Sequence, residues 1–359
     1  MGAKHTLCQR THQTVFKLKI AIIVNPLIPV PPEQYGGIER IVFMLIQELK
    51  KNGHDVTLYA NEHSQPGCKL VGYRESAHYG IKDLVKINRL TSKIAFQHFD
   101  IVHTFGRMSN IALLMLSRIP KIVSYQLPPT ISQVKKAVSI AHKNSLRFIA
   151  CSNYIANQIN TFADVTTIYN GVDINDYDFN ADVAPDAPLT FLGRIQHEKG
   201  TAIAIHAAKK TNQKLVIAGN VPNEPKHQQY FEEQVKPYID GEQIKYIGPV
   251  NNRQKNQLLR NSKAFLMPVT WDEPFGIVMA EALACGTPVI GLRRGAVPEV
   301  VSHGINGFVC DTKADLTKAI SNIDSINRIT CRQIAEQKFS AGVLAKQYEE
   351  LYQLATRKN

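Results

Sequence analysis

The segment Trp271–Gly286, WDEPFGIVMAEALACG, places two glutamates eight residues apart with Pro-Phe-Gly between them. Proline suits the first turn of a helix because its φ is preset and its missing N–H is not needed there, so Pro274 predicts a helix that begins near Phe275. The backbone N–H groups of Phe275 and Gly276 then stay open for an anion. Glu281 follows among apolar residues, where a carboxylate needs a polar partner. Alone, the segment fits equally well a buried helix with one glutamate reaching solvent.

A second segment favours a diphosphate site. Leu189–Gly193, LTFLG, is typical of a short buried strand, and a helix is expected to begin at Thr201. Arg194 and Lys199 lie five residues apart between the two. Two cations at one strand-to-helix turn can converge on a diphosphate together with the helix N-terminus. Cationic side chains on loops usually just contact water. That alternative does not explain why two of them occur at one helix start in the same chain as the paired glutamates.

Together these segments resemble the retaining glycosyltransferases of family four (glycosyl transferases group 1), which have the GT-B fold. The resemblance covers roughly residues 17–340 and is most specific in the C-terminal half. The motifs that carry it are YGGIER (35–40), IYNGVD (168–173), GRIQHEKG (193–200), EPFGIVMAE (273–281), ACGTPVIG (284–291) and RRGAVPEVVSHGINGFV (293–309).

The order of apolar runs predicts an α/β protein. Short apolar strands alternate with amphipathic helices in both halves, which is typical of doubly wound parallel sheets. Strands are expected at 19–24, 55–60, 100–103, 121–124, 148–150, 165–169, 189–193, 214–218, 244–247, 264–267, 289–291 and 308–310, and helices at 37–51, 83–98, 152–162 and from near 201, 230, 252, 275, 296 and 315. The resemblance implies two Rossmann-like domains that face each other across a cleft.

Five segments are expected along the chain. Residues 1–16 form a flexible N-terminal extension, and 17–169 form a Rossmann-like acceptor domain. A linker rich in Asn, Asp and Pro occupies 170–188. Residues 189–340 form the nucleotide-sugar-binding domain, and the helix within 341–359 is expected to pack back on the first domain, as the resemblance implies.

The resemblance assigns catalytic roles to four side chains. Arg194 and Lys199 would hold the diphosphate and stabilise the charge that develops on the leaving nucleoside diphosphate. Glu273 would bind hydroxyls of the donor sugar. His103 would lie at the cleft edge, at the end of the strand DIVH, where the family often has His-x-His; here the second histidine is replaced by Phe105. A lone histidine at a strand end is more often structural, so both roles stay open for His103.

The remaining expected contacts to the nucleotide-sugar are mostly from the backbone. Glu281 would accept hydrogen bonds from the ribose hydroxyls. The N–H groups of Phe275, Gly276 and Ile277 would meet sugar or phosphate, and the base would lie against the backbone near Val250. Gly36 and Gly37 permit close approach of their backbone to the diphosphate.

Charge is unevenly distributed. The chain carries 42 Lys and Arg against 30 Asp and Glu, which gives +12. Residues 1–168 hold 20 basic and 9 acidic residues (+11), and the remainder holds 22 and 21 (+1). The excess indicates an anionic partner, such as an acidic or lipid-linked acceptor or a membrane surface, contacted by basic helical segments such as 81–93 and 133–147. No recognition motif supports binding to nucleic acid.

Features that are absent from the sequence lead to expectations about metal, cofactor and cellular compartment. The six cysteines are scattered, and neither they nor the histidines form a ligand cluster. Asp176-Tyr177-Asp178 is formally an Asp-x-Asp motif, but we interpret it as solvated linker. We therefore expect no required metal or cofactor, the nucleotide-sugar being a co-substrate. Without a signal h-region or a bilayer-length apolar run, we expect a cytoplasmic protein, peripheral at the inner face of the plasma membrane.

The expected function is transfer of a hexosyl group, with retention, from a nucleotide-sugar (a UDP-sugar foremost) to an acceptor in surface glycan or glycolipid assembly. No Asp or Glu of the N-terminal half stands out as a nucleophile, which favours front-face attack over double displacement. Alternatives stay open: glucosylation of a small soluble acceptor, a nucleotide-sugar hydrolase or epimerase, and a non-catalytic nucleotide-sugar-binding partner on the same fold.

Overall fold

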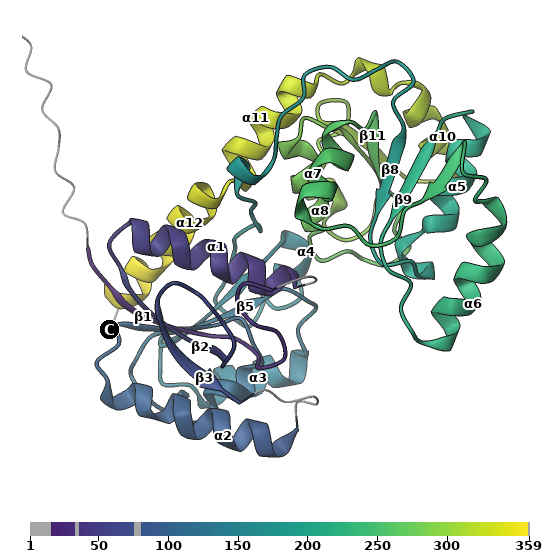
Figure 1. Ribbon diagram of the computed structural model, residues 1–359. Coiled ribbons are helices and arrows are strands. Elements are labelled where there is room, and N and C mark those ends of the chain that lie inside the picture. The colour runs from purple at the N-terminus through teal and green to yellow at the C-terminus, as the bar shows by residue number, and fades with distance from the viewer. Residues whose placement is uncertain (1–15, 33–35, 75–79, 358–359) are drawn as a thin grey trace, which may run out of the picture.

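The computed structural model describes residues 16–32, 36–74 and 80–357, arranged as two α/β domains (Figure 1). Each domain has one parallel sheet, of seven and of six strands, so the predicted fold class is confirmed. The expected N-terminal extension, Phe16 apart, and Tyr35 of the YGGIER motif lie outside the described residues.

The N-terminal sheet has the strand order β3-β2-β1-β4-β5-β6-β7. Its strands are β1 Lys19–Ile23, β2 Asp55–Asn61, β3 Lys69–Tyr73, β4 Ile101–Thr104, β5 Lys121–Tyr125, β6 Leu146–Ala150 and β7 Val165–Thr167. The central strands are mostly apolar because helices cover both faces of the sheet, and their few polar residues, such as His103 and Ser124, are buried too. The edge strand β3 was not predicted, since it is only partly buried and lacks a continuous apolar run.

Helices cover the two faces of this sheet unequally. The helix α1 (Gly37–Lys51) lies on one face; α2 (Ile81–Ser92) and α3 (Ile131–Ile140) lie on the other, with the 3-10 helices η1 (Lys93–Phe96) and η2 (Met108–Leu114). The helix expected over 83–98 is thus divided into α2 and η1. The helix expected over 152–162 is wrong beyond its first turn, because α4 spans only Asn153–Ala156 and turns follow it.

The C-terminal sheet has the order β10-β9-β8-β11-β12-β13. Its strands are β8 Leu189–Leu192, β9 Leu215–Ala218, β10 Ile244–Tyr246, β11 Ala264–Met267, β12 Val289–Leu292 and β13 Gly307–Cys310. Its helices are α5 Thr201–Lys210, α6 Pro225–Gln234, α7 Asn252–Arg260, α8 Ile277–Ala284, α9 Val297–Val300, α10 Lys313–Ser321 and α11 Arg328–Phe339, with 3-10 helices η3 Ile174–Asp176, η4 His197–Lys199, η5 Lys236–Tyr238 and η6 Ile323–Ser325. The start expected for α6 near Tyr230 is wrong, since Pro225 opens it five residues earlier, and α11 was not predicted.

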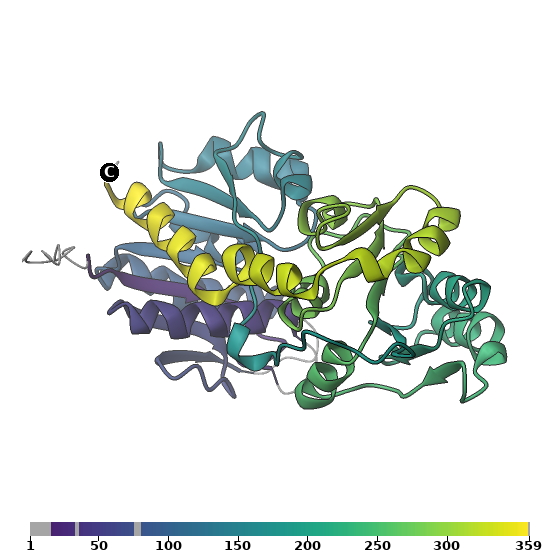
Figure 2. The same cartoon turned by 90° about the horizontal axis from the view of Figure 1, so that it is seen from above.

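The last helix, α12 (Ala341–Arg357), returns to the N-terminal domain and crosses it beside α1 (Figure 2). Its buried side chains recur at helical spacing and join the core of that domain together with the apolar face of α1. They are Leu344, Ala345, Tyr348, Leu351, Tyr352 and Ala355. The N-terminal core is therefore completed by the C-terminal end of the described chain.

In the part of the chain that the structure describes, none of the helices combines the length and the apolarity that spanning a bilayer requires.

This packing predicts a difference between two leucines of one helix. Leu351 is 4% exposed and Leu354 is 50% exposed. Leu351→Ala should lower the free energy of unfolding of the N-terminal domain by about 2–5 kcal/mol, because it leaves a cavity between α12 and α1. Leu354→Ala should cost less than about 0.5 kcal/mol. Urea unfolding followed by circular dichroism measures both, and equal costs would contradict the packing described.

Candidate functional site

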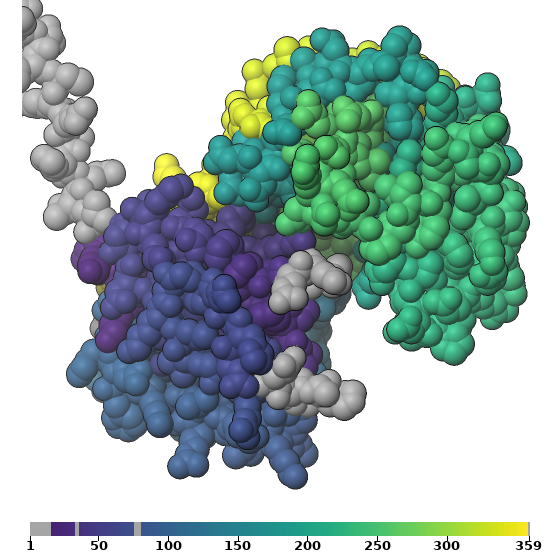
Figure 3. Space-filling view, viewed as in Figure 1, coloured from purple at the N-terminus to yellow at the C-terminus, as the bar shows by residue number. Residues whose placement is uncertain are grey.

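The helices α1 and α8 follow the carboxyl ends of β1 and β11, and both begin at the space between the domains, which is where open α/β sheets bind ligands. Figure 3 shows this space as a hollow on the face in view. The N-termini of α1 and α8 meet across it, since a Cβ atom on Gly37 would lie 3.4 Å from Ile277 Cδ1. The hollow is therefore bounded by one helix N-terminus from each domain.

An ion pair joins two of the residues expected to act on the donor. Lys199 Nζ lies 2.7 Å from Glu273 Oε2, and Trp271 Nε1 donates a hydrogen bond of 3.0 Å to the same oxygen. The ammonium also lies 4.6 Å from the centre of the Trp271 ring. Glu273 is buried, so its charge is balanced by Lys199 from another loop. The structure brings these two residues together.

The loop that carries Lys199 is fixed by a glycine. Gly200 has φ 77°, and a Cβ atom there would lie 2.0 Å from the carbonyl oxygen of Pro268. Only glycine fits this approach, which holds η4 against the strand end of β11. Arg194 lies on the same β8–α5 loop with its side chain exposed.

The start of α8 differs from the prediction. The helix begins at Ile277, not near Phe275, because Gly276 adopts a left-handed conformation (φ 77°) and caps it. Pro274 therefore lies before the helix. The Phe275 side chain is buried against Tyr169 and Phe339.

Glu281 is buried in α8 and has partners from the chain itself. Its Oε1 is paired with Lys255 Nζ and accepts a hydrogen bond of 2.7 Å from the Tyr177 hydroxyl. Burial raises the pKa of this carboxyl, but the Lys255 charge, its hydrogen bond and that of Tyr177 bring the pKa below its usual value. Arg40 of α1 contributes to this lowering from across the hollow. Binding of ribose by Glu281 stays a prediction.

Sequence reasoning missed Lys255 and Tyr177. A signal for Lys255 exists: it precedes Leu258 and Leu259 by three and four residues, on the inner side of α7. A lysine at such a position indicates a buried counter-ion. Tyr177 gives no local signal, because its partner lies 104 residues away.

The position expected for His103 is wrong. The side chain is fully buried beneath α12, not at the cleft edge. Its ring nitrogens lie 2.6 Å from the Tyr352 hydroxyl oxygen and 2.7 Å from Ser124 Oγ. Burial lowers the pKa of His103 to about 3, which keeps the ring neutral. The strand DIVH points this residue into the layer between sheet and α12, so it has a structural role.

The predicted glycines lie at the first turn of α1. Gly36 is buried and precedes the helix, and Gly37 begins it. Glu39, which the sequence did not single out, is buried beside Gly36, and this burial raises its pKa. Val250 is half-buried in the loop between β10 and α7.

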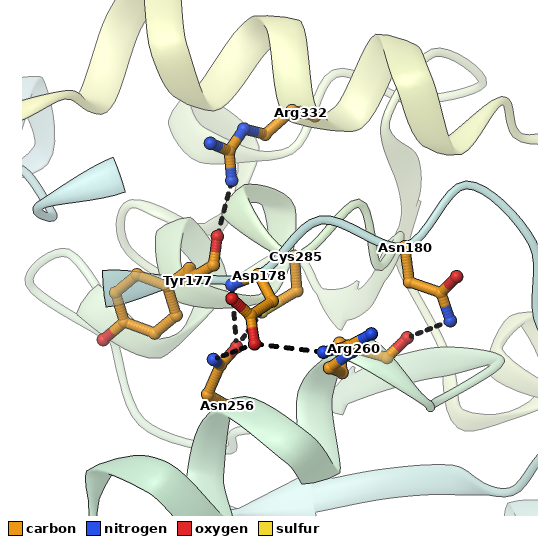
Figure 4. A network of polar contacts seen from close by, with 7 residues as sticks. All are labelled: Tyr177, Asp178, Asn180, Asn256, Arg260, Cys285 and Arg332. Atoms are coloured by element: carbon orange, nitrogen blue, oxygen red, sulfur yellow. Dashed lines mark hydrogen bonds and ion pairs between the residues drawn. The ribbon is translucent and has the colours of Figure 1, made fainter. Parts of the chain in front are cut away.

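The interpretation of Asp176-Tyr177-Asp178 as solvated linker holds for the two aspartates, which are exposed, but not for Tyr177, whose hydroxyl donates to Glu281. Asp178 Oδ2 accepts hydrogen bonds from Arg260 Nη1 (3.0 Å) and Asn256 Nδ2 (3.1 Å), and its backbone N–H donates to Asn256 Oδ1 (Figure 4). Arg332 Nη1 donates to the Tyr177 carbonyl (2.8 Å). The segment after η3 is thus tied to α7 and α11, and its side chains already have protein partners.

Unlike Glu273 and Glu281, which pair with lysines of their own domain, Glu299 connects the two domains. Glu299 of α9 accepts hydrogen bonds from the backbone N–H groups of Asn153 (2.7 Å) and Tyr154 (2.8 Å), at the start of α4. Tyr154 in turn donates to Asp272 Oδ2 (3.3 Å). These contacts close the side of the hollow formed by α4 and α9. No local sequence pattern indicates these contacts, since they join residues 118–146 positions apart.

Comparisons with known proteins identify the family. The family model of glycosyl transferases group 1 matches residues 180–339, and that of glycosyltransferase family 4 matches residues 35–176. The chain belongs to the family-four glycosyltransferases.

Relatives and solved structures agree with this assignment. The chain is 23% identical to the putative glycosyltransferase YtcC of Bacillus subtilis (strain 168), over 95% of this chain and 94% of that protein. It has the fold of AviGT4, a glycosyltransferase involved in avilamycin A biosynthesis (TM-score 0.71, 24% identity, 95% and 99% coverage). The same holds for Anabaena HepE in complex with UDP (TM-score 0.75, 18% identity, 93% and 99% coverage).

The burial of His103 predicts a pH dependence of stability. The pKa of His103 is lower in the folded protein than in the unfolded chain, so between pH 6.5 and 3 a proton binds the unfolded chain but not the folded protein. The free energy of unfolding is therefore highest above pH 6.5 and decreases as the pH falls toward 3. Between pH 6.5 and 5 the wild type should lose about 1.6 kcal/mol more than His103→Gln, whose side chain does not titrate. Urea unfolding of both proteins at each pH measures the difference; parallel losses would contradict the assignment.

The Lys255–Glu281 pair predicts a coupling energy. Lys255→Met should cost about 3–5 kcal/mol of unfolding free energy, because it leaves a buried carboxylate without its counter-ion. Adding Glu281→Gln should restore part of that loss, so the double-mutant cycle should give roughly 1–3 kcal/mol of coupling. The exposed pair Lys236–Glu232 is the control, with a coupling below about 0.5 kcal/mol. If the unfolding free energies lost in the two single variants simply add in the double variant, the Lys255–Glu281 ion pair would be contradicted.

Proposed function

We propose that this glycosyltransferase moves a hexosyl group from a UDP-sugar to an acceptor in surface glycan or glycolipid assembly, with retention of the anomeric configuration. The observation that carries the proposal is the Lys199–Glu273 pair at the base of the interdomain hollow, beside the N-terminus of α8. HepE, which has this fold, binds UDP. Support for the donor class therefore comes from the local chemistry and from a structural neighbour.

Arg194 and Lys199 hold the diphosphate in this proposal. Their positive charge stabilises the negative charge that builds up as the bond between the sugar C1 and the diphosphate oxygen breaks. Glu273 keeps the Lys199 ammonium in place before the donor arrives and accepts hydrogen bonds from sugar hydroxyls. Glu281, whose Oε1 is held by Lys255 and Tyr177, receives the ribose.

Attack occurs on the face from which the diphosphate leaves. The acceptor hydroxyl forms a bond to C1, and its proton passes to the departing phosphate oxygen, so no protein base is needed. Glu39 is the buried carboxyl near the α1 side of the hollow, and its raised pKa disfavours the ionised form that a nucleophile requires. In this mechanism the two cations neutralise the leaving group, so no metal is required.

The acceptor in this proposal is lipid-linked or acidic and reaches the hollow from the basic N-terminal domain. Transfer to a small soluble acceptor is the other outcome that the experiment below can give.

Turnover of the donor tests the proposal. Purified protein is incubated with labelled UDP-, GDP- and ADP-sugars, with and without a lipid extract, and released nucleotide and glycosylated product are measured. Arg194→Ala and Lys199→Ala should each lower turnover by about 10²–10³-fold, as loss of one preorganised charge donor does. Lys210→Ala, an exposed lysine at the end of α5, is the matched control and should retain full turnover.

Thermal unfolding of the same variants separates loss of function from loss of fold. Activity of Arg194→Ala and Lys199→Ala near that of the wild type would overturn the assigned roles. Turnover only with a GDP- or ADP-sugar would correct the donor. Product that stays in the aqueous phase would identify a soluble acceptor.

A further inference from the structure

One helical layer of the N-terminal domain lies on the side of the sheet opposite α12. It consists of α2, η1, η2 and α3, which we call the α2–α3 face (Figure 1). Side chains join its elements: Asn88 Nδ2 donates to the Ser109 carbonyl (2.8 Å), and Thr91 Oγ1 donates to the Asn110 carbonyl (2.9 Å). The His142 N–H donates to Met115 O (2.9 Å), which connects α3 to η2. The layer is therefore continuous.

The outer side of this layer is unusually apolar. Sixteen large apolar side chains are exposed in the described part of the chain, and nine of them lie between residues 81 and 140. They include Ile81 and Val85 on α2, Phe96 on η1, and Leu113 and Leu116 in and after η2. Phe96 is 84% exposed. Buried residues of the same helices already fill the core, so these exposed ones contribute nothing to it.

Cations surround the apolar side chains. Residues 81–143 contain ten Lys or Arg and two Asp, and of the ten only Lys121 is fully buried. On α2, Lys82 and Lys86 are exposed next to Ile81 and Val85, and on α3 Lys135 and Lys136 are exposed between apolar positions. Lysine stems can lie along an apolar phase while their ammonium groups stay in the polar boundary. Exposed apolar side chains with ammonium groups around them are suited to bind a partner whose surface is anionic and whose interior is apolar.

We propose that the α2–α3 face docks on an anionic phospholipid bilayer, with the apolar side chains in the headgroup–acyl boundary and the lysines on lipid phosphates. A second copy of the chain is disfavoured, because two such faces would bring like charges together. The inference deepens the proposed function: α2 and α3 start at the carboxyl ends of their preceding strands, so the docked face places the hollow beside the membrane, where a lipid-linked acceptor would reside.

Sedimentation with vesicles tests the docking. The full chain is spun with vesicles of phosphatidylcholine alone and with 30% phosphatidylglycerol, at low and high salt. The wild type should bind the anionic vesicles and be released by salt. Phe96→Ser/Leu116→Ser should weaken binding by about tenfold or more, since two apolar side chains are lost from the boundary. Lys82→Gln/Lys86→Gln should weaken it by roughly 25-fold, about fivefold for each cation.

Matched controls lie on the C-terminal domain. Ile305→Ser/Ile329→Ser removes two apolar side chains that are 53% and 50% exposed. Lys210→Gln/Lys226→Gln removes two exposed lysines, and both double variants should bind as the wild type does. Donor hydrolysis without lipid should be unchanged in all four double variants.

Absence of vesicle binding with normal donor turnover would overturn the docking alone, whereas binding without turnover would overturn the proposed function alone. The docking would also be rejected if the control variants bound vesicles as weakly as the variants of the α2–α3 face. The same holds if the wild type is a dimer that Phe96→Ser/Leu116→Ser converts to a monomer.

Discussion

Each of the two glutamates in Trp271–Gly286 is held by a lysine from another element, and the arrangement of the site depends on these two pairs. Glu273 is paired with Lys199 from the β8–α5 loop, and Glu281 with Lys255 from α7. A buried carboxylate without such a partner is costly, so each lysine fixes where its own element can lie. The pairs thus position the loop and helix that the donor would contact, before any donor binds.

The contacts between the domains are of a different kind. The helix α12 completes the N-terminal core through apolar burial, which is extensive and has no preferred direction. Glu299 meets two backbone N–H groups of α4, and the Tyr154 hydroxyl meets Asp272, which are directional contacts. Apolar packing attaches the domains to each other, and the hydrogen bonds set their orientation at the side of the hollow next to α4.

Most strands could be predicted because strands covered on both faces are short continuous apolar runs, as in KIAII at β1. The edge strand β3 could not, since water contacts one side of it. Within the site, motif spacing indicated Lys199, Glu273 and Glu281, whereas their partners Tyr177 and Lys255 depend on tertiary packing. The same limit explains His103: a histidine that ends an apolar strand has the same local pattern whether it meets a ligand or a helix that arrives 249 residues later.

The charge asymmetry of the chain has a physical consequence for its two halves. A diphosphate needs only nearby cations and a helix N-terminus, and the C-terminal half supplies them with a net charge of +1. The +11 of residues 1–168 is therefore not required for donor binding. On α2 and α3 this excess coincides with exposed apolar side chains that lie outside the core. A basic surface alone is explained by solubility or steering, but apolar exposure has an unfavourable hydration free energy that only a covering apolar phase removes.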